Sequence, residues 1–149
     1  MSHSLKKAFS LIEVLIFVTI LSLILISSAA IITVSMRQNT LRLNMLKATH
    51  YNEQLIEWIR SEKEVNWNEF LTHGDTTYCF TTDDLTWNNF VVNKDDCEET
   101  LDGKYRRYAI LELDHTTPPT QVVVTAHVEW DESGNRYSTQ LHALFTIWE

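Results

Sequence analysis

Hydrophobic residues near the start of the chain form one long, unbroken run. Residues 14–34 include no charged residue, no proline and no glycine. An α-helix rises about 1.5 Å per residue, so a helix of this length spans roughly 30 Å, the thickness of the hydrocarbon core of a bilayer. The pattern therefore predicts a membrane-spanning helix.

One acidic residue, Glu13, interrupts the wider apolar stretch 9–34 near its start. An ionised carboxylate costs roughly 2.5–3.5 kcal/mol near the centre of a bilayer and less toward its edge. A buried charge of this kind usually has a partner and a function. A cleaved secretory signal is the alternative interpretation. The run exceeds the usual apolar region of about 7–15 residues, although the small residues 27–30 leave this alternative open.

The helical pattern continues beyond the apolar run. Apolar or small residues recur with helical spacing, and Asn52 lies on the same face: Leu41, Met45, Ala48, Leu55 and Ile59. No glycine or proline occurs between residues 9 and 71, so we expect one helix over about 10–64. Its apolar stripe could serve a coiled coil or ordinary core packing. We favour packing against a sheet of the same chain.

Later segments have the β-prone and alternating patterns of strands. We expect strands at 76–82, 85–92, 105–113, 120–130 and 136–148, with a hairpin turn at 131–135. The last three would form an antiparallel meander whose apolar face covers the helix. The predicted fold class is therefore α+β, with a long N-terminal helix packed on a C-terminal antiparallel sheet.

Charge restricts the partners and sets an orientation. The chain has 12 basic and 20 acidic residues, a net charge of −8, which argues against nucleic acid as a passive electrostatic ligand but leaves a local basic patch open. Lys6 and Lys7 precede the apolar run, and positive flanks stay cytoplasmic, so the rest of the chain is expected to face outward.

The two cysteines, Cys79 and Cys97, lie in this outward-facing part. An oxidising environment permits a disulfide between them, which would stabilise the domain by about 3 kcal/mol. Two free thiols or half of a metal site are the alternatives. No C-x-x-C pair is present, which argues against zinc.

Other candidate chemistry is weak, and we expect no enzyme activity, no cofactor and no metal. There is no G-x-S-x-G elbow or glycine-rich phosphate loop. His127, Glu129 and His142 could bind zinc, but a solvated sheet face explains them equally. The acidic loop could bind calcium, although solvation is the simpler interpretation; its members are Asp95, Asp96, Glu98, Glu99 and Asp102. Three aromatic residues could contact a partner, with burial as the default: Tyr51, Trp67 and Trp87.

The stretch KKAFSLIEVLIFVTILSLI resembles the class III signal of type IV prepilins and type II secretion pseudopilins. The resemblance implies that a prepilin peptidase cuts between Ala8 and Phe9 and that Phe9 is then N-methylated. It also implies that Glu13, the fifth mature residue, neutralises the amine of a neighbouring Phe9 during assembly. This family usually has glycine before the cut, whereas this chain has Ala8. Many major pilins carry a proline within the apolar segment, and this chain has none there, as in many minor pilins and pseudopilins.

The resemblance implies a division into a leader (1–8), a transmembrane or filament-core helix (9–35), an amphipathic continuation (36–64) and a β-rich pilin head (65–149). Without Lys6 and Lys7, ten basic residues face twenty acidic ones, a net charge of −10. The implied function is a non-catalytic structural subunit of a type IV pilus or related filament, a minor pilin that primes assembly or presents a binding surface. A type II secretion or competence pseudopilin is the alternative within the family. The alternative of another class is a single-pass, membrane-anchored binding protein with no filament role.

The implied partners are other pilin subunits, reached through the N-terminal helix, together with the prepilin peptidase and the inner-membrane assembly machinery. Membrane lipid surrounds the helix before assembly. The implied location is the inner membrane, crossed once with the N-terminus in the cytoplasm, and then an extracellular or periplasmic filament. The resemblance assigns no surface ligand or nucleic acid to the head.

Overall fold

The computed structural model describes residues 10–82, 84–87, 90–91, 97 and 100–148. The chain divides into two compact units, Met1–Leu41 and Arg42–Glu149. The first unit consists, where it is described, of helix α1. The second unit contains the rest of α1, a short helix and the sheet, and it holds all of the core described below.

Helix α1 runs from Leu11 to Val65, as the absence of glycine and proline predicted. A five-residue helix that the sequence did not predict, α2, follows at Trp67–Leu71. Asn66 separates the two helices because its backbone is extended, with φ −159°. Its side-chain oxygen accepts hydrogen bonds from the backbone N–H groups of Asn68 and Glu69, which caps the start of α2.

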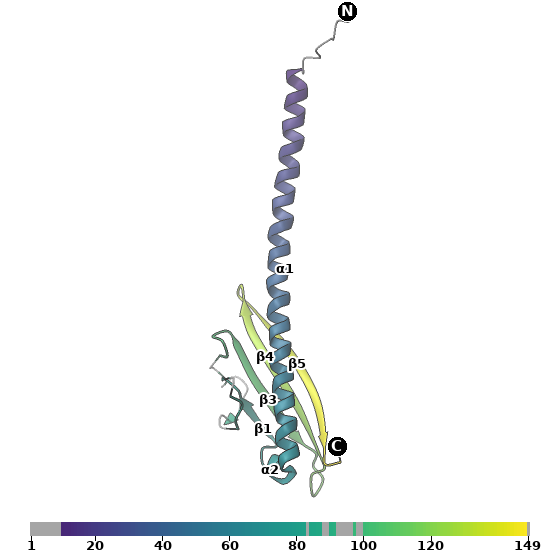
Figure 1. The fold of residues 1–149 in the computed structure, drawn as a ribbon, viewed down its shortest axis with the longest axis vertical. Coiled ribbons are helices and arrows are strands. Elements are labelled where there is room, and N and C mark those ends of the chain that lie inside the picture. The colour runs from purple at the N-terminus through teal and green to yellow at the C-terminus, as the bar shows by residue number, and fades with distance from the viewer. Residues whose placement is uncertain (1–9, 83, 88–89, 92–96, 98–99, 149) are drawn as a thin grey trace, which may run out of the picture. The chain divides into compact units, whose positions relative to one another are not determined.

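The sheet has five antiparallel strands in the order β2-β1-β3-β4-β5 (Figure 1). Their bounds are Thr76–Cys79 for β1, Phe90–Val91 for β2, Tyr105–Leu113 for β3, Gln121–Glu132 for β4 and Asn135–Thr146 for β5. The predicted meander is therefore confirmed. The apolar residues of β4 that were predicted to share one face are all buried: Val122, Val124, Ala126, Val128 and Trp130.

The hairpin between β4 and β5 is regular. Twelve consecutive residue pairs run from Gln121 opposite Thr146 to Glu132 opposite Asn135. Ser133 and Gly134 form the two-residue turn, with φ of 52° and 79°. Two positive φ angles are the signature of a type I′ turn, whose twist matches that of the flanking strands. Gly134 meets this requirement without strain.

The strand predictions before β3 were partly wrong. The predicted strand 76–82 ends at Cys79. Within the predicted strand 85–92, Phe90–Val91 is a strand, whereas the described residues 85–87 are not. Trp87 explains part of the difference. Its ring lies 4.7 Å from that of Trp58, and its indole N–H donates to Glu62 of α1. Side chains of α1, together with the rings of His73 and of Tyr78 in β1, therefore hold Trp87.

The helix face that contacts the sheet also differs in detail from the predicted stripe. Met45 is exposed and Leu41 is half-buried, whereas Tyr51 and Ile56 join the buried face. The buried face begins at Ala48 because Asn44, not Met45, faces the sheet one turn earlier. The side-chain amide of Asn44 donates a hydrogen bond to Glu132 and accepts one from the hydroxyl of Tyr105. Trp67 and Trp87 are partly buried against the core.

Candidate functional site

The N-terminal turn of α1 places Glu13 at the start of the apolar segment. The carbonyl oxygen of Ser10 accepts hydrogen bonds from the backbone N–H groups of Glu13 and Val14, at 2.9 and 3.2 Å. The carboxylate of Glu13 thus lies in the first turn of the helix. A negative charge there interacts favourably with the positive end of the helix dipole.

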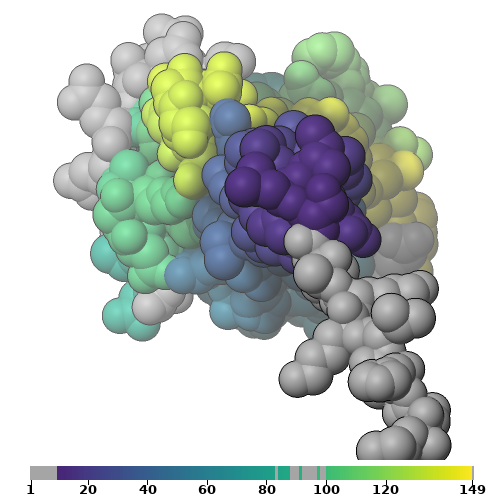
Figure 2. All heavy atoms as spheres, turned by 90° about the horizontal axis from the view of Figure 1, so that it is seen from above, coloured from purple at the N-terminus to yellow at the C-terminus, as the bar shows by residue number. Residues whose placement is uncertain are grey.

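Most side chains that follow Glu13 are apolar, and they are exposed around the whole helix. Figure 2 views the helix from its N-terminal end, and the side chains of its first described turns, in purple, project on all sides. By length and composition, α1 is able to cross a membrane, with a mean hydropathy of 2.8 in its most apolar window. Glu13 is the single charged residue between positions 11 and 34.

The hydroxyl groups of this segment are all satisfied by the helix itself. Each donates to a backbone carbonyl three or four residues earlier, at 2.7–3.1 Å; the donors are Thr19, Ser22, Ser27, Ser28 and Thr33. Such bonds allow hydroxyl groups to lie in an apolar medium. Among residues 10–148 as described, the carboxylate of Glu13 receives no hydrogen bond or ion pair. Among the described residues 11–34, Glu13 is therefore the polar side chain that does not bond to its own helix.

The two processing residues, Ala8 and Phe9, lie outside the described residues, so their predicted roles stay predictions. The acidic loop is described only in part. Asp95, Asp96, Glu98 and Glu99 also fall outside the description, whereas Asp102 is described.

Asp102 contacts α1 and is not free to serve as a metal ligand without giving up these contacts. Its carboxylate lies 2.6 Å from the ammonium of Lys47 and accepts a 2.5 Å hydrogen bond from the hydroxyl of Tyr51. The hydrogen bond from Lys47 lowers the pKa of the Asp102 carboxyl, and the same bond raises the pKa of Lys47. Both side chains of the ion pair are about half exposed, so the pair adds little stability.

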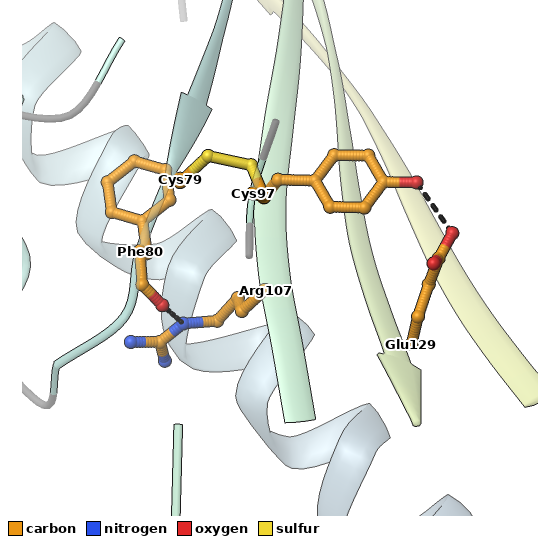
Figure 3. The surroundings of a disulfide bond; sticks show 6 residues. Cys79, Phe80, Cys97, Arg107 and Glu129 are labelled. Carbon is orange, nitrogen blue, oxygen red and sulfur yellow. Dashed lines mark hydrogen bonds between the residues drawn. A yellow bond between two sulfur atoms is a disulfide. The ribbon is translucent and has the colours of Figure 1, made fainter. Parts of the chain in front are cut away.

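A disulfide joins Cys79 of β1 to Cys97, as the sequence predicted, with the two Cα atoms 5.7 Å apart (Figure 3). Both cysteines are buried with Tyr108 of β3, whose hydroxyl donates to Glu129 of β4. Arg107 lies on the other face of β3. It is buried, and it donates to the carbonyl oxygens of Phe80 and Thr82. The disulfide thus ties Cys97 to β1, and Arg107 holds the backbone just after β1 at Phe80 and Thr82.

The side chains considered for zinc are each engaged in other contacts. His142 lies opposite Thr125, and their Nδ1 and Oγ1 atoms are 2.9 Å apart. The ring of His127 stacks on Tyr108 at 4.8 Å, and Glu129 accepts from the hydroxyl of Tyr108. Over the described part of the chain, no three such side chains are grouped to hold a metal ion.

A cluster around His73 was not predicted from the sequence. The ring of His73 stacks on Trp87 at 4.4 Å and 10°, and its Nδ1 lies 2.9 Å from the hydroxyl of Tyr78. Burial lowers the pKa of His73, while the carboxylates of Glu69 and Glu62 oppose this effect. No local signal could have revealed the cluster, because its members come from four separate segments of the chain.

The comparisons with known proteins bear on the N-terminal segment. The model of the prokaryotic N-terminal methylation motif matches residues 3–29, which lie wholly within the first unit. The fold adds a long helix packed on an antiparallel sheet, a pilin-like arrangement. The predicted resemblance to type IV pilin-like prepilins with a class III signal is therefore confirmed. Neither the curated proteins nor the solved structures include a match to the chain.

Proposed function

We propose that the protein is a non-catalytic structural subunit of a type IV pilus or a related filament, a minor pilin that primes assembly or presents a binding surface. The observation that carries this proposal is the methylation motif over residues 3–29, which includes Glu13 as the single charged residue of an otherwise apolar helical segment. The class III signal and the apolar helix are consistent with membrane anchoring before assembly.

The proposed mechanism is mechanical. The helix holds the subunit in the inner membrane until the peptidase removes the leader after Ala8 and the new amine of Phe9 is methylated. During assembly, the Phe9 amine of an incoming subunit pairs with Glu13 of its neighbour. The hydroxyl groups of the segment already bond to their own helix, so this pair is the specific polar contact between otherwise apolar helices. Its role is to set register, a use for which buried charge pairs are well suited.

The N-terminus of the mature protein tests this proposal. Mass spectrometry of the chain from its native membrane should find a mature chain that begins at N-methylated Phe9. Ala8→Gly, which restores the residue usual in the family, should be cleaved at least as completely and serves as the matched control. An intact Met1 would support the single-pass binding protein, and cleavage after residues 27–30 would support an ordinary secretory signal; either result contradicts the proposal.

The role of Glu13 is tested separately. Glu13→Ala should insert in the membrane normally but should fail to enter filaments, because the Phe9 amine loses its partner. Glu13→Gln keeps the shape of the side chain without its charge, so it should fail to nearly the same degree. The measurement is the fraction of the chain found in sheared filaments relative to the membrane. Wild-type incorporation of both variants would exclude a role for the carboxylate.

A type II secretion or competence pseudopilin would share this mechanism and differ in its assembly machinery. Copurification of the chain with a pilus, secretion or competence platform therefore distinguishes these alternatives.

A further inference from the structure

The charged residues are divided unevenly along the chain. Glu13 is the only acidic residue before position 53, so residues 53–149 contain nineteen acidic and seven basic residues, a net charge of −12. Between positions 14 and 52, by contrast, every charged residue is basic: Arg37, Arg42 and Lys47. A basic segment therefore separates the apolar run 14–34 from an acidic remainder.

Two of these three basic side chains have no acidic partner in the part of the chain that the structure describes. The ammonium of Lys47 lies 2.6 Å from the carboxylate of Asp102, which neutralises its charge. Arg37 and Arg42 are exposed, and none of the ion pairs among the described residues involves either one. Because a guanidinium presents a planar fork of N–H donors that matches phosphate, these two arginines can bind a phosphate from outside the chain.

The place of Arg37 on α1 indicates which phosphate it meets. Arg37 follows Val34, the last residue of the apolar run, by three residues, which is about 4.5 Å along the helix axis. The polar headgroup layer on either side of the hydrocarbon core is about 5–8 Å thick. When residues 14–34 fill the core, Arg37 therefore lies at the level of the lipid headgroups. Arg42 follows five residues later on the same helix.

The distance between Glu13 and Arg37 agrees with this placement. Arg37 lies 24 positions after Glu13, which corresponds to about 36 Å of helix. A bilayer is about 30 Å thick across its hydrocarbon core and about 40–45 Å thick with its headgroup layers. With Arg37 in one headgroup layer, Glu13 thus reaches the opposite boundary of the core, where its carboxylate costs less free energy than at the centre.

We propose that Arg37, together with Arg42, binds the phosphates of anionic lipid headgroups at the end of the apolar run. A basic side chain is attracted to an anionic lipid surface over about one Debye length, roughly 8–10 Å, whereas more distant charges are screened. The two arginines therefore attract anionic lipid although residues 53–149 are acidic. This inference rests on the proposed function, because it assumes that residues 14–34 anchor the chain in a membrane, and it adds which lipid surrounds the anchored chain.

Nucleic acid offers the same phosphate chemistry and is the competing partner. A duplex in solution would have to reach Arg37 within the headgroup layer, and the net charge of −12 on residues 53–149 would repel it. A lipid headgroup already lies beside Arg37 when the chain is anchored and needs no such approach. These observations therefore favour lipid over nucleic acid.

Fluorescence quenching beside Arg37 tests the proposal on the full chain. Ser35→Cys is introduced, and the chain is purified from native membranes and coupled to a small fluorophore; Cys79 and Cys97 do not react because they form a disulfide. The labelled chain is reconstituted in phosphatidylcholine vesicles that contain a trace of spin-labelled phosphatidylglycerol or of spin-labelled phosphatidylcholine. Because the spin label quenches at short range, the ratio of the two quenching constants reports which lipid lies beside residue 35. The anionic lipid, phosphatidylglycerol, should be enriched roughly fivefold, the effect of about one arginine near anionic lipid.

Replacement of the arginines in the labelled chain provides the second measurement. Arg37→Gln should remove most of the enrichment, and Arg42→Gln should lower it less, because Arg42 is farther along the chain from the apolar run. Arg37→Lys should keep most of it, since the positive charge remains. The matched control, Arg60→Gln, removes an exposed basic side chain of α1 that pairs with Glu57, and it should keep the full enrichment. All three replaced arginines are exposed, so the fold should be retained, which the intact disulfide verifies.

Competing anions identify the source of the phosphate. Sodium phosphate and sodium chloride at equal ionic strength should weaken the enrichment equally, because both act by screening. A stronger effect of phosphate would assign the arginines to the free ion, and a loss of enrichment on addition of a DNA duplex would assign them to nucleic acid. Either result would overturn the proposal.

Two further results would also overturn it: equal quenching by the two lipids when both arginines are present, or the same loss with Arg60→Gln as with Arg37→Gln. Mass spectrometry of the same preparation separates this proposal from the proposed function. Methylated Phe9 without enrichment contradicts only the lipid contact, whereas an intact Met1 contradicts the filament function itself.

Discussion

The two parts of α1 form the same secondary structure for different physical reasons. In the first unit, no described side chain of the helix is buried, and every hydroxyl of the apolar segment bonds to its own backbone. In the second unit, seven side chains from Ala48 to Lys63 are buried. The first part depends on an apolar surrounding, whereas the second depends on the sheet. A single helix can therefore combine a segment suited to lipid or a filament core with one that completes a folded head.

The largest expected effect is on the free energy of unfolding of the head, the second unit, when leucine is replaced by alanine in each part of α1. Leu55→Ala removes a side chain that is 0% exposed and should lower the free energy of unfolding of the head by about 2–5 kcal/mol. Leu21→Ala, in the first unit, should leave it unchanged. Denaturant unfolding of the detergent-solubilised chain, followed by near-ultraviolet circular dichroism, measures both. Equal losses for the two variants would contradict the division.

The disulfide lies in the head, so its removal should affect the unfolding of the head and not the helix of the first unit. Replacing both cysteines, Cys79→Ser with Cys97→Ser, should cost about 3 kcal/mol of unfolding free energy, since it releases the chain between β1 and Cys97. The expected signature is a lower midpoint of the head transition, while the helical signal of the first unit stays the same. Ser22→Ala, a change of a hydroxyl in the first unit, is the control. An unchanged midpoint in the double variant would show that Arg107 alone suffices to hold the segment.

The regions that sequence reasoning predicted are those with one dominant period. The absence of glycine and proline predicted α1, and strict alternation predicted β4 with its buried face. The methylation motif likewise depends on a contiguous stretch, so the class of the N-terminal segment was readable from the residues.

The regions that sequence reasoning missed depend on contacts between distant residues. Trp87 is held by Trp58 and Glu62 of α1, and no period in residues 85–92 reveals this. Helix α2 is too short to show a period and depends on the cap provided by Asn66. The buried face of α1 shifted because Asn44, a polar residue, meets Tyr105 and Glu132. A hydrophobic pattern alone does not register such polar contacts.

The smallest expected effect is the pH dependence of the unfolding free energy, which arises from His73 in the head and not from the first unit. Burial lowers the pKa of His73 below its ordinary value of 6.5, so the unfolded chain binds the proton more tightly than the folded head does. The contribution of neutral His73 is fully present above pH 6.5 and is lost as the pH falls from there toward the lower pKa of the folded head. Protonation would also place a cation between Trp87 and the hydroxyl of Tyr78, near Glu62 and Glu69.

His73→Gln cannot take up this proton, so its unfolding free energy should fall less than that of the wild type between about pH 7 and 5. The exposed His142→Gln serves as the control and should retain the wild-type slope. Denaturant unfolding at a series of pH values measures all three chains, and an identical slope for His73→Gln and the wild type would mean that the acid-sensitive group of the head lies elsewhere.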